Sequence, residues 1–152
     1  MKIDFLKQRR EMLGSLLAFG LLTALAVPAV AAGTEVKVDM WDKPDGTQGM
    51  ILSSNEVKAG KVTFMVTNIS KSDQEHEFLV ARTDLTPDKM PLTQAGARVD
   101  ESKLAGLKEL GDLEPGKSGK LTLTLKPGRY LLLCNEEGHF KAGMHAYLTV
   151  TP

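Results

Sequence analysis

The stretch RYLLLCNEEGHFKAGMHAYLTV, residues 129–150, decides how the C-terminal part of the chain folds. Residues 129–134 and 146–150 are rich in leucine, tyrosine, threonine and valine, a composition typical of β-strands. The residues between them include two glycines and several charged side chains. The pattern predicts two strands joined by a loop at one end of a sheet.

Three side chains at and beyond the end of the first strand recur at an interval of five residues. They are the thiol of Cys134, the imidazole of His139 and the thioether of Met144. Gly138 and Gly143 stand directly before the second and third, where a residue without a Cβ lets the backbone turn sharply. The spacing therefore predicts that the three side chains converge at the end of the sheet.

Further strands are marked by period-two alternation upstream. Apolar and polar residues alternate at positions 36–40, 62–66 and 121–125, and residues 77–82 form another strand candidate. Short strands separated by turns predict an all-β fold, an antiparallel β-sandwich. The turn-forming pairs are Asp45-Gly46, Ala59-Gly60, Pro115-Gly116 and Pro127-Gly128.

One segment, residues 84–112, departs from this rhythm. It contains two prolines and then, over residues 100–110, leucines at helical spacing with charged residues between them. The pattern predicts a short helical insertion around residues 100–110, packed on the flank of the sandwich. Gly106 lies in its middle and weakens a helix by about 1 kcal/mol relative to alanine. The spaced leucines are Leu104, Leu107 and Leu110.

The first 32 residues have the layout of a secretory signal peptide. Four basic residues lie among the first ten, and an uncharged apolar run extends from residue 13 to residue 27. Ala29-Val30-Ala31 then offers a cleavage site of small residues, and Arg9-Arg10 is compatible with twin-arginine as well as general export. An uncleaved membrane anchor is the alternative, because residues 12–34 carry no charge.

The remaining residues, 33–152, are enough to bury one core and are predicted to form a single domain. Removing residues 1–32 takes away four of 19 basic and two of 19 acidic side chains, which leaves 15 and 17 and a net charge of −2. A nucleic-acid-binding protein should show a concentrated basic field. The sequence shows none, so a nucleic-acid partner is not expected.

The lone cysteine carries the strongest functional signal in the chain. In an exported protein it has no partner for an internal disulfide, which leaves an inert buried thiol, an intermolecular disulfide or a metal ligand. A second imidazole, His76, lies upstream at the edge of an apolar run. One thiolate and two imidazoles with a weak axial methionine form the ligand set of a blue-copper site. Zinc is the alternative ion, but methionine is a poor ligand for it.

With these residues in view, the chain resembles the cupredoxin family, and the resemblance covers most of residues 35–151. It rests on the Cys-x4-His-x4-Met loop, on Leu148-Thr-Val150 after it, and on His76 downstream of Val66-Thr-Asn68. The loop spacing is closest to the auracyanin, rusticyanin and sulfocyanin type. The resemblance implies a Greek-key β-sandwich with one type 1 copper ion. The implied ligand atoms are Nδ1 of His76 and His139, Sγ of Cys134 and Sδ of Met144.

The residues beside the first histidine depart from the family pattern. Many cupredoxins have an asparagine there that supports a hydrogen bond to the cysteine sulfur, whereas His76 is flanked by Glu75 and Glu77. Carboxylates close to the copper would lower the reduction potential unless they point to solvent. His145 follows Met144 directly, and we expect it at the surface, with competition for the axial position as the alternative.

Two functions fit such a site. The first is an exported, monomeric one-electron carrier with His139 as the electron exit and with partners such as cytochrome c or a terminal oxidase. The second is a periplasmic or otherwise extracytoplasmic copper-binding or copper-delivery protein for tolerance or oxidase assembly. An enzyme is not expected, because the chain has three histidines and a catalytic copper centre needs several beyond the first site. Membrane attachment is expected only if the N-terminal segment stays uncleaved.

Overall fold

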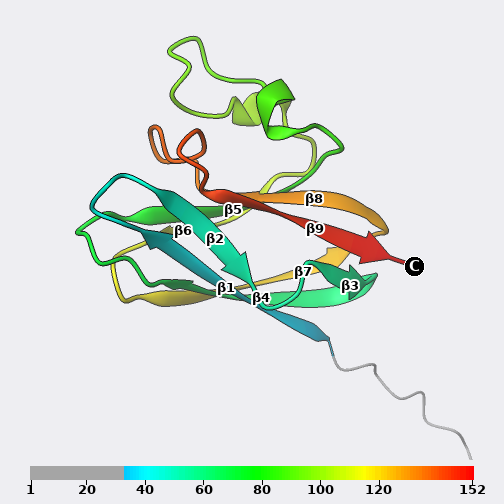
Figure 1. Ribbon diagram of the computed structural model, residues 1–152. Helices are drawn as coiled ribbons and strands as arrows, with labels where there is room; N and C mark the ends of the chain where they lie inside the picture. The colour runs from blue at the N-terminus through cyan, green and yellow to red at the C-terminus, as the bar shows by residue number, and fades with distance from the viewer. Residues whose placement is uncertain (1–32) are drawn as a thin grey trace, which may run out of the picture. The chain divides into compact units, whose positions relative to one another are not determined.

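Two β-sheets pack face to face in the computed structural model, which describes residues 33–152 (Figure 1). This arrangement confirms the predicted β-sandwich. The signal peptide predicted at residues 1–32 lies outside the described residues. Across residues 33–152, no helix has the length and apolar character needed to cross a membrane.

The first sheet has the strand order β2-β1-β4-β7. β1 and β4 run parallel, whereas β2 and β7 pair antiparallel with their neighbours. Its strands are β1 (Thr34–Asp42), β2 (Gln48–Leu52), β4 (Gly60–Asn68) and β7 (Ser118–Leu125).

The second sheet has the order β3-β9-β8-β5-β6 and is antiparallel except for the pair β3–β9. Its strands are β3 (Glu56–Lys58), β5 (His76–Arg82), β6 (Lys108–Leu113), β8 (Gly128–Leu133) and β9 (His145–Thr151). The predicted antiparallel pairing therefore holds for most of the sandwich but not for β1–β4 and β3–β9, which run parallel. The chain leaves the first sheet after β2 to form β3 and then returns, so β4 lies beside β1 in the same direction.

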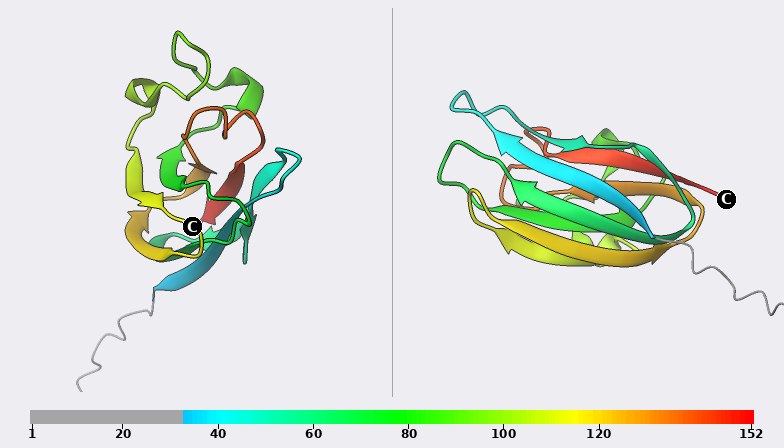
Figure 2. Two further views of the ribbon diagram at one scale, coloured as in Figure 1. Left: turned by 90° about the vertical axis from the view of Figure 1, so that its left-hand side faces the viewer. Right: turned by 90° about the horizontal axis from the view of Figure 1, so that it is seen from below.

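The main core lies between the two sheets, which Figure 2 shows in two further views. Every second residue of β1 and β4 points into it, as the period-two alternation predicts. Met40 and Phe64 are fully buried there. Members from these two strands are Val36, Val38, Met40, Val62, Phe64 and Val66.

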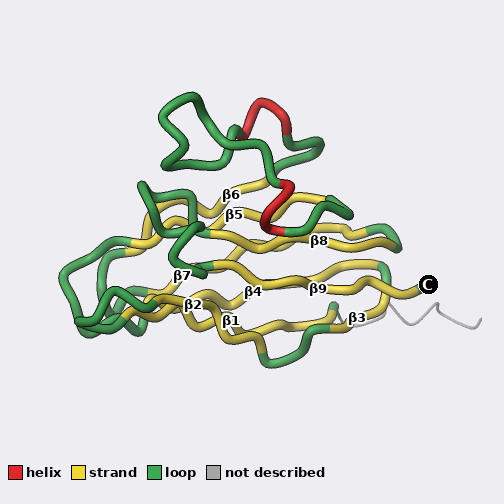
Figure 3. The backbone as a smooth tube through the Cα atoms, turned by 45° about the horizontal axis from the view of Figure 1, so that its top comes forward, coloured by secondary structure: helices red, strands yellow, loops and turns green. Residues whose placement is uncertain are grey.

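A second, smaller cluster covers the outer face of the β8–β5 part of the second sheet. It forms where the β5–β6 segment, residues 83–107, folds back over Leu79, Ala81, Leu131 and Leu133. Figure 3 shows this segment as loop with two short helical turns, η1 (Pro87–Lys89) and η2 (Glu101–Lys103). Its buried contributors are Met90, Val99 and Leu104, and Phe140 joins them from the β8–β9 loop.

The structure does not contain the helix that was predicted across residues 100–110. Only the three residues of η2 are helical, and β6 begins at Lys108. Gly106 has a φ of 67°, a left-handed conformation that ends any helix at this point. Leu104 and Leu107 pack in the outer cluster, whereas Leu110 packs against the main core. The leucines thus serve two different cores rather than one helical face.

Candidate metal centre

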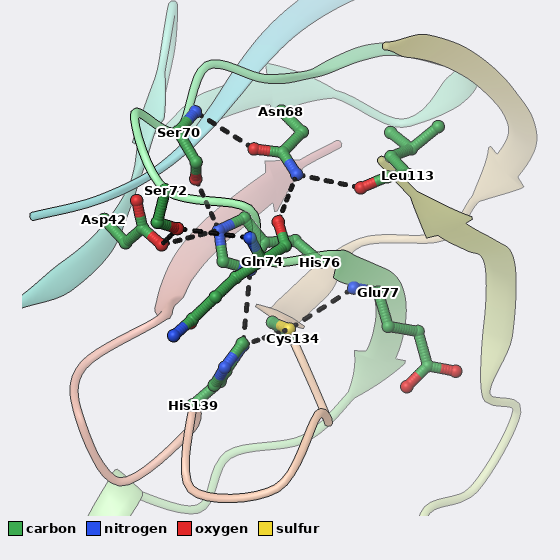
Figure 4. Close-up of polar contacts among 10 residues, drawn as sticks. All are labelled: Asp42, Asn68, Ser70, Ser72, Gln74, His76, Glu77, Leu113, Cys134 and His139. Carbon is green, nitrogen blue, oxygen red and sulfur yellow. Dashed lines mark hydrogen bonds and ion pairs between the residues drawn. The ribbon is translucent and has the colours of Figure 1, made fainter. Parts of the chain in front are cut away.

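Three predicted ligands meet at one end of the sandwich. His76 is the first residue of β5, Cys134 directly follows β8, and His139 lies in the β8–β9 loop. Their side chains point toward one another in Figure 4. The ligand atoms of His76, Cys134 and His139 all lie within 4.8 Å of one another. The antiparallel pairing of β5 with β8 places the start of β5 near the end of β8, from which the loop brings His139 to His76, 63 positions away in sequence.

The separations suit a single metal ion. Nδ1 of His76 lies 3.2 Å from Nδ1 of His139, and that same nitrogen of His139 lies 3.4 Å from Sγ of Cys134. Metal bonds are about 2.0 Å long to imidazole nitrogen and about 2.3 Å long to thiolate sulfur. Two such bonds sum to about 4 Å or more, which exceeds both separations. A single ion placed among these side chains could therefore contact both imidazole nitrogens and the sulfur.

Met144, the predicted axial ligand, closes the β8–β9 loop. Its backbone carbonyl accepts a hydrogen bond from the Cys134 N–H at 3.0 Å, and its own N–H donates to the carbonyl of His139 at 3.0 Å. The Met144 side chain is fully buried in the main core together with Cys134. These bonds hold the backbone of Met144 beside that of Cys134, and the side chains of both residues are buried.

Burial sets the protonation of the three grouped side chains. Burial, followed by the charge of His139, lowers the pKa of His76 to about 4. Burial also lowers the pKa of His139 and raises the pKa of the Cys134 thiol to about 12. At pH 7 both imidazoles are therefore neutral and can act as ligands. The thiol keeps its proton until a metal displaces it.

The outer nitrogen of His76 is held by a small polar network. Nε2 of His76 lies 2.6 Å from the hydroxyl of Ser70 and 3.9 Å from the carboxylate of Asp42. The Ser72 hydroxyl donates to that carboxylate. Burial acts to raise the pKa of Asp42, but the serine hydrogen bonds and His76 outweigh it and lower the pKa. Such a partner fixes the orientation of a ligand imidazole.

A backbone N–H next to His76 donates a hydrogen bond to the cysteine sulfur, at the position where many cupredoxins have an asparagine. The N–H of Glu77 donates to Sγ of Cys134 at 3.3 Å, while the Glu77 carboxylate points away from the sulfur (Figure 4). That carboxylate gathers with Asp112 and Glu136, whose ligand atoms lie within 4.8 Å of it. Burial, then the charges of nearby carboxylates, raises the pKa of Glu77 to about 7.

The other histidines differ in access to solvent. His139 is partly exposed and lines a shallow pocket of about 420 Å³ together with Asp73, Gln74, Glu75 and Glu136. His145 is partly buried rather than a free surface residue, and its ring centroid lies 4.9 Å from that of Phe140. The grouping of possible ligands contains His76 and His139 but not His145.

Several supporting residues could not be picked out from the sequence. Asp42 and Ser72 are 30 positions apart, and nothing in their local sequence marks them as partners. Asn68 is fully buried, and its side chain donates to the carbonyls of Gln74 and Leu113. It anchors the turn that leads into His76. Its place in the family pattern was the one available signal.

Comparisons with known proteins agree with this geometry. No family model matches the chain. Auracyanin-B of Chloroflexus aurantiacus is 51% identical over 41 residues, which are 26% of this chain and 17% of that relative. The match thus spans about a sixth of the length of the curated relative.

Solved structures resemble the chain over most of its length. An auracyanin from Roseiflexus castenholzii aligns with a TM-score of 0.50 and 21% identity, covering 79% of this chain and 100% of the auracyanin. Rusticyanin from Thiobacillus ferrooxidans aligns with a TM-score of 0.51 and 17% identity, covering 79% of each chain. The chain therefore has the cupredoxin fold. Within that class its similarity is to auracyanin and rusticyanin, as the loop spacing predicted.

Proposed function

We propose that the protein binds one type 1 copper ion and carries single electrons between redox partners. The grouping of Nδ1 of His76, Nδ1 of His139 and Sγ of Cys134 within 4.8 Å carries this proposal. Met144 is the axial ligand in this proposal, and its buried position directly after the loop supports that role. A bound copper ion supplies a one-electron couple, which soft thiolate and imidazole ligands accommodate in both oxidation states.

The residues of the chain supply a rigid and dry setting. Cys134, Met144 and His76 are fully buried, His76 begins strand β5, and Cys134 directly follows strand β8. Ligands that are held in place need little rearrangement when the charge of the ion changes. His139 reaches solvent and is the proposed electron exit. The solved auracyanin from Roseiflexus castenholzii, which has this fold, is described as reduced by sodium dithionite.

We further propose export and a redox protein as partner. The signal-like residues 1–32 support a periplasmic or otherwise extracytoplasmic location. Cytochrome c or a terminal oxidase are the expected classes of partner, and the protein acts as a monomer. Catalysis is not part of the proposal, because the two histidines of the site leave only His145 for any further centre.

Copper delivery is the second candidate function. The partly exposed edge of His139 beside Asp73 and Glu75 would also allow a copper ion to pass to a partner. The two functions differ in how long the ion stays. Transfer of Cu(I) to a chelator within minutes favours delivery, whereas retention over hours together with reversible electron exchange favours a carrier.

The decisive experiment is a titration of the purified protein with Cu(II), followed by visible and EPR spectroscopy. Thiolate-to-copper charge transfer should produce an intense blue band in the wild-type protein. Cys134→Ser should abolish the band, whereas the matched control His145→Gln should keep it. Stoichiometric copper binding without the band, or a band that survives in Cys134→Ser, contradicts the proposal.

A further inference from the structure

The β8–β9 loop is tied to a part of the chain that lies far from it in sequence. In Figure 1 the β5–β6 segment stands beside this loop on the outer side of the second sheet. Residues 97–101 of the segment meet residues 135–138 of the loop through hydrogen bonds. The loop residues in contact therefore lie between Cys134 and His139, two of the proposed ligands.

Asn135 makes most of this connection. It directly follows Cys134 and is 2% exposed. Its side chain acts like a neighbouring strand for Val99, because its Oδ1 accepts the Val99 N–H at 2.7 Å and its Nδ2 donates to the Val99 carbonyl at 3.1 Å. The same Nδ2 lies 2.7 Å from a carboxylate oxygen of Glu101. A buried amide with three partners has one well-defined position.

Two further contacts strengthen the same junction. Arg98 donates to the backbone carbonyl of Asn135 at 2.8 Å and to the carboxylate of Glu136 at 2.9 Å. The Gly138 N–H donates to the Ala97 carbonyl at 2.9 Å, directly before His139. The backbone on both sides of the span from Cys134 to His139 is thus held from outside the loop.

We propose that Asn135 is a positioning residue that holds Cys134 and His139 at ligand separation before any metal binds. It does so by locking the β8–β9 loop to the β5–β6 segment. If Asn135 only fastened the β5–β6 segment, its removal would lower the stability of the fold and change neither the copper site nor the access to the thiol. The copper readouts below rest on the proposed function, whereas the thiol readout does not.

The test compares Asn135→Ala with Leu104→Ala. Leu104 packs in the outer cluster and is 9% exposed, so its truncation loosens the same segment without removing a polar contact to the loop. We expect Asn135→Ala to release copper to a chelator about tenfold faster than wild type and to shift the blue band. Leu104→Ala should stay close to wild type in both. Arg98→Met, at a partly exposed position, removes the two Arg98 hydrogen bonds and should change both in the same direction as Asn135→Ala but by less.

The second readout uses the metal-free protein. A thiol reagent should modify Cys134 about tenfold faster in Asn135→Ala than in Leu104→Ala, because the released loop exposes the sulfur. Equal behaviour of the two variants in both readouts overturns the inference. A wild-type protein without a blue band refutes the proposed copper function instead. The thiol rates then decide the role of Asn135 alone: faster modification of Asn135→Ala supports it, and equal rates overturn it.

Discussion

The backbone of Glu77 contacts the candidate metal centre, whereas its side chain points away from it. Its backbone N–H donates to Sγ of Cys134, yet its carboxylate points away and gathers with Asp112 and Glu136. The sequence indicated a possible carboxylate beside the first histidine, but only the strand direction decides where such a side chain points. Alternate residues of a strand face opposite sides. His76 therefore faces the site and the Glu77 side chain does not.

Glu77 should make the metal-free protein less stable at high pH. The pKa of Glu77 is about 7 in the folded state and 4.5 for an unperturbed glutamate, so between these pH values the folded state binds more protons than the unfolded state. The free energy of unfolding then falls as pH rises through this window. Glu77→Gln should remove the loss and add on the order of 1 kcal/mol at pH 8, after allowance for solvent screening.

Urea denaturation of metal-free protein at pH 5 and pH 8 measures this effect. The matched control is Glu75→Gln, which removes an exposed carboxylate two positions away and should leave the pH dependence unchanged. A gain in Glu77→Gln that is as large at pH 5 as at pH 8 would show that the carboxylate's charge is not the cause.

Met144→Leu should leave the blue colour intact and raise the reduction potential. The substitution nearly conserves side-chain volume in a fully buried position, so the fold should tolerate it. Removal of the weak axial donor favours Cu(I) over Cu(II), because the cuprous ion needs fewer ligands. Voltammetry of both proteins measures the difference, which we expect to be roughly tens of millivolts. A lowered potential would mean that another group occupies the axial position.

At the scale of elements, alternation predicted the strands well and leucine spacing predicted the helix wrongly. Residues on strands such as β1 and β4 face either a dry core or solvent, and this contrast appears directly in the sequence. The leucines of residues 104–110 face two separate cores, one on each side of the second sheet. Their spacing resembles a helix by coincidence, and only the tertiary arrangement separates Leu104 from Leu110.

The β1–β2 hairpin offers a direct test of cross-strand packing. Trp41, the only tryptophan of the chain, lies opposite Gly49, and a Cβ at that glycine would stand 2.7 Å from the indole ring. Gly49→Ala should push the ring outward, shift its fluorescence to longer wavelength and cost about 1–3 kcal/mol of unfolding free energy. Ile51→Ala on the same strand, at an exposed position, should change neither. Unchanged emission in Gly49→Ala would contradict this packing.

At the scale of the molecule, the sandwich brings together proposed ligands that the sequence could name but not place. His76 and Cys134 were recognisable from residue type and spacing, yet their approach depends on the pairing of β5 with β8. The network of Asp42, Ser70 and Ser72 depends on how β1 and the β4–β5 turn meet. These residue types are common at any surface, so no local pattern distinguishes them. Long-range pairing was the missing information.

The same long-range pairing would make a bound metal ion a cross-link of the whole fold. An ion that binds only the folded chain stabilises it by about 2.7 kcal/mol when its free concentration is 100 times the dissociation constant. Copper should therefore raise the Tm in calorimetry by several degrees. The gain should increase with pH, because binding displaces the proton of a thiol whose pKa is about 12. Cys134→Ser serves as the control and should lose most of the gain. An equal rise of Tm in that variant would place the copper elsewhere on the protein.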